Sequence, residues 1–515
     1  MINRFSVPQL SDCTKELAKV ASGKIVPNLI LANARVLSTY TDRILKNKEI
    51  WISNGRICCI KDNGESRKIF GKDIISYDAK SGILAPGLID PHMHIESSMM
   101  TGCAYAEPAL LNGTTTIFCD SHEIGNVCDV EGIEWMLEDC RQAPLSIFLT
   151  IPSTIPATNN KIETAGGNLT PKKIGKIFDK WPEALALGEK MDFVSVCNGN
   201  QRSHQIISES LKRNKPISGH MFGREFIAAY AASGITDTHE SEEKYLTSDL
   251  LDSGLWIFLR GGNPNTPWNS LPEAIKAILE LKASNKRVCV CTDDRDADDL
   301  FYFGLDWVTR QAAKKGINPI SAWSMGSLHS AHRYNIDQDY GGIGGGRRAD
   351  LVLLNDKYEV QNTWLGGKLV VEDKKITNLL EEQLEKKRYK YPKKAYNTVK
   401  IFNNYSLIPK IPNSPVKINV IKTELPGIVT KQHQIKINKS IISWSNIMKE
   451  NNLTHLAVIE RYKKTKKVAH GFIKDFNLKS GSVGSSVGHD AHNIIIAGTN
   501  ENDMNIALDE IKRTQ

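Results

Sequence analysis

Short apolar runs in the middle of the chain alternate with longer segments in which apolar residues recur at helical spacing. Segments such as 130–140 and 272–284 carry apolar side chains near positions i, i+3 and i+4, a spacing typical of amphipathic helices. Runs such as 288–291 are apolar without interruption, as expected for a parallel sheet that is covered on both faces. Eight candidate strands follow this pattern: 83–90, 114–120, 146–152, 184–189, 216–220, 234–239, 255–261 and 287–293. Eight β/α units predict an α/β protein with a TIM barrel over residues 83–334.

Two β-rich segments flank this alternating region. Residues 29–60 and 349–373 contain short β-rich runs, and Asn-Gly and Asn-Ala turns separate those of the first segment. Because the chain ends of an inserted domain usually lie close together, the two flanks can pair with each other. We therefore expect residues 1–82 and 335–375 to form one small β-sandwich-like domain.

The last quarter of the chain changes in composition. Residues 376–400 are rich in Lys and Glu, which indicates either an exposed helix or a charged linker. Residues 401–515 are again strand-rich and end in an amphipathic helical pattern. This pattern predicts a separate C-terminal α+β domain.

The composition is that of an ordinary globular protein. The 515 residues leave room for about three domains, and 41% hydrophobic with 24% charged residues excludes a wholly disordered chain or a rod. The net charge of +8 (66 basic against 58 acidic residues) is modest for this length. No apolar run approaches the roughly 20 residues of a membrane helix, and the first residues lack the apolar core of a signal peptide. We expect a cytoplasmic protein whose ten cysteines are reduced.

Metal-binding residue types follow the predicted barrel strands. The carboxyl ends of barrel strands face the active site, so polar residues there are candidates for chemistry. His92 and His94 are spaced i, i+2 and project from the same side of an extended chain. A lone His at a strand end is usually only a hydrogen-bonding residue, but six candidates occur here in barrel order: His92, His94, Glu189, His220, His239 and Asp293. Imidazoles and carboxylates in this combination predict a site for two metal ions with a bridging carboxylate.

Longer strings around these residues resemble a known family. They are PGLIDPHMHIESSMM at 86–100, GTTTIFCDSHEIGNV at 113–127, CTDDR at 291–295 and GFIKDFNLKSGSVGSSVGHDAHN at 471–493. These strings resemble the amidohydrolase superfamily and, within it, the adenine deaminase family. The resemblance covers roughly residues 28–507, and the HxHIESSMM and HDxHN strings are far more specific than a bare HxH.

The resemblance implies a binuclear site in which iron or manganese is favoured over zinc. Glu189 matches the position of the bridging ligand, where many relatives carry a carbamylated lysine. The adjacent Lys190 is the competing candidate. Because neighbouring strand residues face opposite sides, only one of the two reaches the metals, and we favour Glu189.

The implied reaction is the hydrolytic deamination of adenine, or of a closely related aminopurine, to hypoxanthine and ammonia by a metal-bridged hydroxide. Asp293, as ligand and proton carrier, and Glu189 are the catalytic candidates. The expected partners are a small heterocyclic substrate and a second copy of the chain in a homodimer, with no membrane and no nucleic acid.

Three alternatives remain open at this stage. An amidohydrolase could direct the same hydroxide at the carbonyl carbon of a cyclic amide or another heterocycle. A catalytically silent scaffold would be expected to have lost ligands, and all six are present. Lysines in 386–400 and 463–467 could contact nucleic acid, but few aromatic residues are interleaved with them.

Further candidates surround the six. Substrate-contacting or supporting roles are expected for Glu96, Ser97, Ser98, Asp120, His122, Glu123, Asp294, Arg295, His489, Asp490 and His492. The two serines and Glu96 could bind the purine edge or cap the next helix. The group from Asp120 to Glu123 could support the ligands, contact substrate or hold a further metal. The string from His489 to Asn493 is either a surface turn or a loop over the barrel mouth, and we favour the loop.

The chain also departs from the pattern of the adenine deaminase family. Ser218 stands where the family has Asp, and Phe222 stands in a string where the family has Pro. Phe303 lies in a string where the family carries a histidine. We expect these departures to alter the substrate pocket and to leave the metals unaffected.

Overall fold

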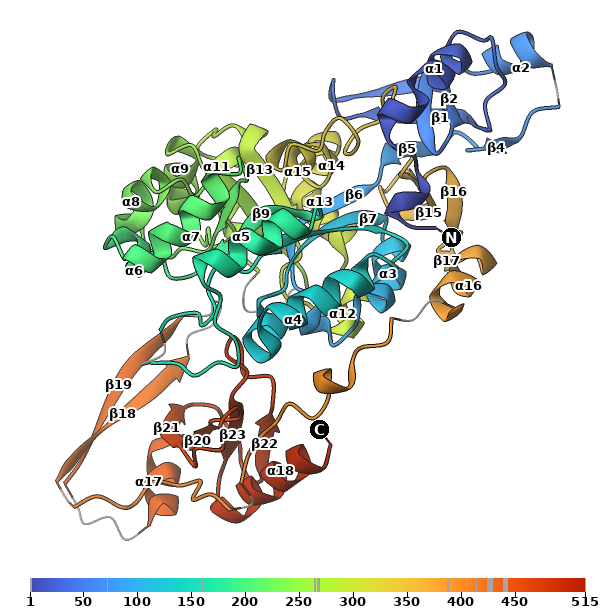
Figure 1. The fold of residues 1–515 in the computed structure, drawn as a ribbon. Coiled ribbons are helices and arrows are strands. Elements are labelled where there is room, and N and C mark those ends of the chain that lie inside the picture. The colour runs from blue at the N-terminus through green and yellow to red at the C-terminus, as the bar shows by residue number, and fades with distance from the viewer. Residues whose placement is uncertain are drawn as a thin grey trace.

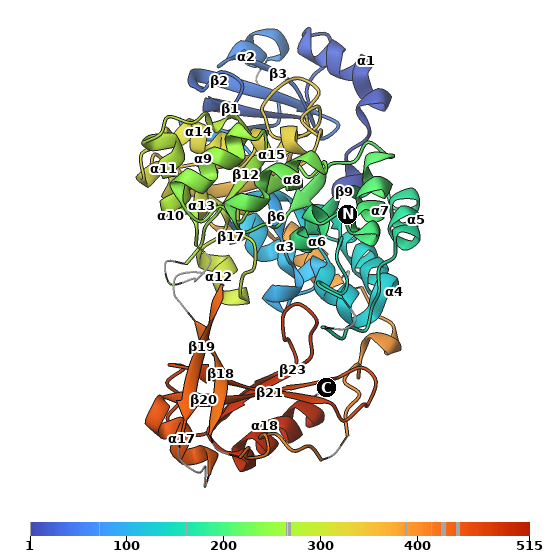
Figure 2. The ribbon, with the colours of Figure 1, turned by 90° about the vertical axis from the view of Figure 1, so that its left-hand side faces the viewer.

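The computed structural model describes residues 2–71, 73–159, 162–263, 265, 269–386, 389–402, 404–413, 415–423, 429–438 and 443–514. A sheet built from the first and middle parts of the chain, a central barrel and a C-terminal sheet follow one another along the molecule (Figure 1). In the view turned by 90°, the C-terminal part lies directly below the barrel (Figure 2).

Eight parallel strands form the barrel. They are β6 (Leu88–Met93), β7 (Thr114–Asp120), β8 (Ser146–Ile151), β9 (Ala184–Lys190), β10 (Ile217–Gly219), β11 (Asp237–Thr238), β12 (Trp256–Arg260) and β13 (Val288–Cys291). β6 to β10 form one ladder and β11 to β13 a second. The Thr236 amide donates to the Ile217 carbonyl at 3.1 Å, and the Asp293 amide donates to the His92 carbonyl at 3.1 Å. These two contacts join the ladders on both sides, so the expected (β/α)8 barrel is confirmed.

Helices cover the outside of the barrel. They are α3 (Gly102–Leu111), α4 (His122–Cys140), α5 (Pro171–Lys180), α6 (Phe193–Cys197), α7 (Gln201–Leu211), α8 (Ile227–Ala232), α9 (Lys244–Asp252), α10 (Leu271–Ala274), α11 (Lys276–Leu279), α12 (Ala297–Tyr302), α13 (Leu305–Lys314), α14 (Pro319–Met325) and α15 (Leu328–Arg333). Every residue of β7, β8 and β13 is buried. Burial on both faces explains why β13 is apolar throughout and β8 largely so.

The two flanks of the barrel share one sheet. It contains β1 (Leu29–Ser38), β2 (Arg43–Ser53), β3 (Arg56–Asp62), β4 (Ser76–Asp78), β5 (Ile83–Pro86), β14 (Leu351–Leu354), β15 (Val360–Leu365), β16 (Lys368–Glu372) and β17 (Lys375–Ile376). β5 pairs with both β1 and β14 and thereby joins the N-terminal strands to those that follow the barrel. The helix α1 (Leu10–Ala21) packs against the same sheet.

The candidate strand 83–90 is two strands in two different sheets, which corrects the expectation that the barrel begins at residue 83. β5 belongs to the flanking sheet, and the barrel strand β6 starts at Leu88. Gly87 lies between them, and a Cβ atom there would come within 2.2 Å of Thr115 Oγ1. An apolar run does not reveal which sheet its residues join, so the division at this glycine was missed.

The C-terminal part has its own six-stranded sheet. Its strands are β18 (Val416–Thr423), β19 (Thr430–Ile437), β20 (Leu453–Ile459), β21 (Val468–Lys474), β22 (Ser482–Ser485) and β23 (Ile494–Gly498), with helices α17 (Trp444–Asn451) and α18 (Glu501–Arg513). In the charged segment 376–400, of which 387 and 388 lie outside the described residues, Asn378–Lys386 forms helix α16.

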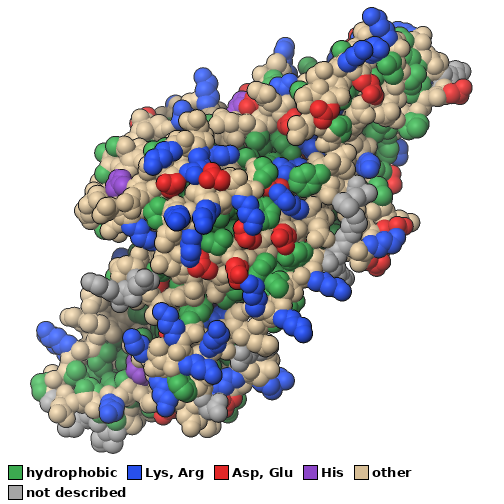
Figure 3. All heavy atoms as spheres, in the orientation of Figure 1, with side chains coloured by type: hydrophobic (Ala, Val, Ile, Leu, Met, Phe, Trp, Pro, Cys, Tyr) green, Lys and Arg blue, Asp and Glu red, His purple; other side chains and the backbone are tan. Residues whose placement is uncertain are grey.

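Over the barrel, basic side chains are interspersed with acidic ones on the face shown in Figure 3. None of the helices in the described ranges combines the length and the apolar character that crossing a membrane requires. The ten cysteines are free thiols, and all seven buried ones have a raised pKa with burial as its largest cause.

We expect Trp323→Ala to lower the free energy of unfolding of the barrel by about 3–5 kcal/mol, because it leaves a large cavity. Trp323 is 1% exposed, and its indole N–H donates to the Pro86 carbonyl at 3.0 Å, at the junction of the two sheets. The measurement is urea denaturation followed by circular dichroism. Tyr302→Ala is the control, because Tyr302 is 73% exposed. Equal effects of the two substitutions would contradict this role of Trp323.

Candidate active site

Six side chains from five barrel strands and their carboxyl ends converge at one end of the barrel. They are His92 and His94 at the end of β6, Glu189 in β9, His220 after β10, His239 after β11 and Asp293 after β13. Their nitrogen and oxygen atoms form three overlapping groups, each with its atoms within 4.8 Å of one another: His92–His94–Glu189, His92–His239–Asp293 and Glu189–His220–His239. Residues that are far apart in the sequence thus form one compact cluster.

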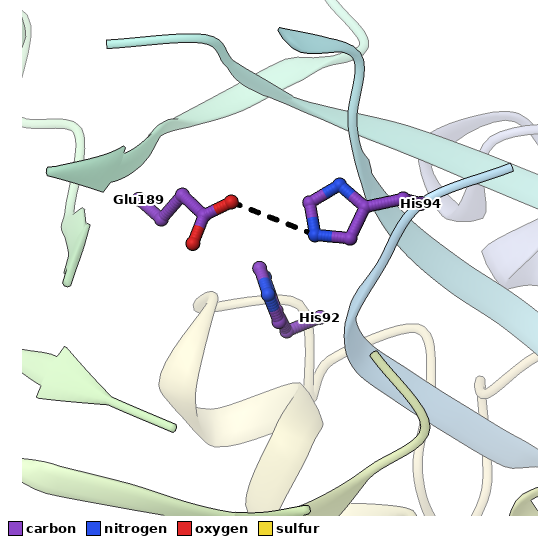
Figure 4. A group of neighbouring side chains, drawn as sticks. All are labelled: His92, His94 and Glu189. Atoms are coloured by element: carbon purple, nitrogen blue, oxygen red, sulfur yellow. Dashed lines mark ion pairs between the residues drawn. The ribbon is translucent and has the colours of Figure 1, made fainter. Parts of the chain in front are cut away.

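Glu189 lies at the centre of this cluster. Its Oε1 is 3.5 Å from His94 Nε2, as Figure 4 shows, and its Oε2 is 2.9 Å from His220 Nδ1 and 3.3 Å from His239 Nε2. Burial alone would raise the pKa of Glu189, but hydrogen bonding to His220 and His239 holds it well below its usual value. Each carboxylate oxygen therefore faces a different set of imidazoles.

The backbone around β9 fixes the direction of the Glu189 side chain. The Glu189 amide donates to Asp120 Oδ2 at 2.9 Å. Gly188 makes this contact possible, because a Cβ atom there would lie 2.0 Å from the same oxygen. Lys190 points to the other side of the strand, where its fully buried ammonium group pairs with Asp192.

Asp293 divides its two oxygens between the histidines and an arginine. Its Oδ1 lies 3.5 Å from His92 Nε2 and 3.4 Å from His94 Nε2, and its Oδ2 accepts from Arg260 Nη1 at 2.8 Å. Burial alone would raise the pKa of Asp293, but the two histidines and the charge of Arg260 hold it well below its usual value. Asp293 also has a φ of 58°, in the left-handed region that Asp tolerates better than most residues.

Three buried residues that support this cluster were not singled out from the sequence. Glu240, fully buried, accepts from Arg260 Nη1 at 2.6 Å and from Nη2 at 2.8 Å, and lies 3.4 Å from His239 Nε2. Asp90 accepts from the Thr292 hydroxyl at 2.5 Å and so ties β6 to the end of β13. Glu240 directly follows His239, and Arg260 is the last residue of β12, so the strand-end position of both residues was an available signal.

The donor set fits divalent metal ions. His92 Nε2 is buried and makes no hydrogen bond, although a buried imidazole nitrogen normally has a partner. Four imidazoles with two carboxylates are donors that Mn²⁺, Fe²⁺ and Zn²⁺ accept. These six residues could therefore hold two ions, with Glu189 reaching both.

A cavity of about 560 Å³ opens above the cluster. Glu189, His220, His239 and Asp293 line its floor, and the C-terminal part contributes Ser485, Val487, His489 and Asp490. Figure 2 shows a dark red loop of the C-terminal part reaching towards the barrel. Asn493 fastens this loop, since its side chain donates to the Thr164 carbonyl at 2.9 Å. The string from His489 to Asn493 thus lies at the barrel mouth.

Of the further candidates, Ser97, Glu123, Asp294 and Arg295 also line this cavity. Ser97 and Ser98 donate to the backbone carbonyls of His94 and Ile95. Glu96 faces an adjoining cavity, and burial, then the charge of Glu123, raises its pKa to about 7. The next helix, α3, is capped by Thr101 instead. Neither serine therefore caps that helix.

The three positions that depart from the family pattern do not contact the cavity directly. The Ser218 hydroxyl lies 3.3 Å from the Tyr334 hydroxyl, and the Phe303 ring packs on Trp307. Phe222 lies edge-on to the His220 ring at 5.1 Å. None of the three is among the described residues that line the cavity. Ser218 is buried and the two phenylalanines are half-buried. That the three departures alter the pocket stays a prediction, and any effect would pass through neighbours such as His220.

The barrel and its buried cluster define a metal-dependent amidohydrolase, and residues 83–370 match the amidohydrolase family. A β-aspartyl dipeptidase from Fervidobacterium islandicum AW-1 has a similar fold, with a TM-score of 0.53 and 16% identity over 68% of this chain and 98% of that one.

Comparison with curated proteins narrows the class. The chain is 59% identical over its whole length to adenine deaminase 2 of Bradyrhizobium sp. (strain ORS 278), and 58% to an adenine deaminase of Chelativorans sp. (strain BNC1), covering 85% of each protein. Residues 427–515 match the adenine deaminase C-terminal domain. The chain belongs to the adenine deaminase family, which confirms the resemblance seen in the sequence.

Alanine at His92 or His239 is expected to remove at least one equivalent of bound metal per chain. The reason is that each of these imidazoles belongs to two of the three donor groups. Elemental analysis of the purified variants measures this loss. His332→Ala serves as control, since His332 is exposed and its ion pair is with Asp337, outside the cluster. Full metal occupancy in both site variants would exclude this cluster as the metal site.

Proposed function

We propose that the chain hydrolyses adenine to hypoxanthine and ammonia, with His92, His94, Glu189, His220, His239 and Asp293 as ligands of two divalent cations. The observation that carries the proposal is Glu189, which turns one oxygen towards His94 and the other towards His220 and His239 beneath a cavity. The names of the full-length relatives support adenine as the substrate.

The reaction replaces the exocyclic amino group of adenine by oxygen from water. Divalent cations held at the six residues would lower the pKa of a water molecule and so supply the nucleophile at neutral pH. Asp293 Oδ1 takes the proton of that water and passes it to the departing amino group, which leaves as ammonia. Adenine and one water thus give hypoxanthine and one ammonia.

The rest of the site holds Asp293 ready for this transfer. Arg260 binds Asp293 Oδ2 and, with Nη1 and Nη2, the Glu240 carboxylate. The other oxygen, Oδ1, accepts from the Asp294 amide at 2.9 Å and is turned towards His92 and His94. Arg295 and Asp294 line the same cavity beside Asp293 and are proposed to contact the heterocycle. Arg295 Nε and Nη2 are buried and make no hydrogen bond within the described chain, so they can serve as donors to ring nitrogens.

We further propose manganese or iron in preference to zinc, and a cytoplasmic homodimer. Two carboxylates with four imidazoles form a donor set that suits manganese and iron. Elemental analysis and ammonia release from a panel of aminopurines, aminopyrimidines and cyclic amides test metal and substrate together. If the protein hydrolyses a cyclic amide and releases no ammonia from adenine, the proposed deamination is wrong and cyclic amide hydrolysis is the reaction.

Asp293→Asn is expected to lower kcat for adenine by about 10²–10⁴-fold while KM changes less, because the amide cannot accept the proton. Steady-state ammonia release measures both constants. Metal content is determined on the same sample, so that loss of a ligand is distinguished from loss of the proton carrier. Near-normal turnover would rule out the role of Asp293.

Arg260→Gln is expected to lower kcat by roughly 100-fold, because Asp293 and Glu240 lose the charge that orients them. Arg260→Lys keeps the charge and should recover part of the activity. Arg287→Gln is the control, since this exposed arginine precedes β13 at the opposite end of the barrel. If Arg260→Gln and Arg287→Gln have the same kcat, Arg260 does not position Asp293.

A further inference from the structure

A second set of metal-binding side chains lies between the barrel and the C-terminal loop. His122 begins helix α4 at the end of β7, and His489 and Asp490 belong to the loop of the C-terminal part. Their ligand atoms lie within 4.8 Å of one another. None of the three is among the six residues assigned to the two proposed ions.

The two imidazoles converge on one carboxylate oxygen. His489 Nε2 lies 2.5 Å from Asp490 Oδ1, and His122 Nε2 lies 3.4 Å from the same oxygen. The other nitrogen of each ring faces a different carboxylate. His489 Nδ1 is 3.1 Å from Glu123 Oε1, and His122 Nδ1 is 3.3 Å from Glu189 Oε1.

This pairing places a carboxylate within ion-pair distance of the second ring nitrogen, where metal-binding histidines have one. Such a histidine donates its second ring N–H to a carboxylate, which fixes the ring and turns the other nitrogen to the ion. Here both Nδ1 atoms face carboxylates and both Nε2 atoms face the shared centre. Without a cation, each ring would have to carry a proton on both nitrogens to donate in both directions.

An unused donor atom points at the same centre. His122 is 1% exposed, and neither of its ring nitrogens makes a hydrogen bond. A buried imidazole without a hydrogen bond is rare and costly. Asp490 and His489 also line the large cavity, so an ion can enter from solvent.

We propose that His122 Nε2, His489 Nε2 and Asp490 Oδ1 bind a third divalent transition-metal ion, which fastens the C-terminal loop over the barrel mouth. Glu123 orients His489 as its carboxylate partner. Two imidazoles and one carboxylate suit Zn²⁺, Mn²⁺ or Fe²⁺, with positions left for water. The site would supplement the anchor that Asn493 makes to Thr164. This inference does not depend on the substrate proposed above.

Counting zinc tests the third site. Metal-free protein is loaded with Zn²⁺, passed through a desalting column and analysed for zinc per chain. We expect three zinc ions in the native chain and two in His489→Ala and in Asp490→Asn. His470→Ala is the matched control and should keep three, because His470 is exposed on β21 of the same C-terminal sheet.

A second readout reports on the loop itself. Zn²⁺ should slow amide hydrogen exchange of residues 486–493 in the native chain and in His470→Ala, and this protection should be lost in both site variants. Circular dichroism verifies that each variant is folded, and a misfolded His489→Ala leaves Asp490→Asn to decide.

Two zinc ions in the native chain, or the same number in the native chain and both site variants, would overturn the third site and leave a His–Asp–His ion cluster. The proposed function is tested separately. It fails if the protein releases no ammonia from adenine, whatever the zinc count.

Discussion

The arrangement of the barrel mouth depends on stabilising the buried carboxylate of Glu189. Its side chain is 4% exposed, and a charge removed from water is stable only with close partners of opposite or polar character. β6, β10 and β11 supply these partners as imidazoles. Asp120 and Gly188 fix the backbone of β9 so that the carboxylate points at them.

Further polar and charged side chains connect Glu189 to the surrounding parts of the structure. Its Oε1 faces His94 and also His122, whose second nitrogen faces Asp490 of the C-terminal loop. On the other side of the cluster, Arg260 links Asp293 to Glu240. The barrel floor and the C-terminal loop are therefore connected through buried charges, and the cavity between them is built by both parts. This connection gives the C-terminal part a direct contribution to the site.

Residues at strand ends could be predicted from the sequence, whereas contacts between residues far apart in the chain could not. Asp293 and the histidines at strand ends were predicted, because strand ends are visible as the limits of apolar runs. Glu240 and Arg260 were missed, since nothing local shows that they pair across neighbouring strands. The position of Ser218 against Tyr334 was missed for the same reason, because these residues lie far apart in the chain.

The sequence by itself determined the barrel, the family and the set of residue types at the strand ends, because the period of apolar positions and the local strings carry that information. Only the tertiary structure decided that Ile83–Pro86 joins the flanking sheet, that Glu189 offers its oxygens to separate histidines and that the loop from His489 to Asn493 reaches the barrel mouth. The physical reason is that hydrogen bonds and ion pairs between distant segments depend on side-chain direction and packing, which the pattern along the chain does not encode.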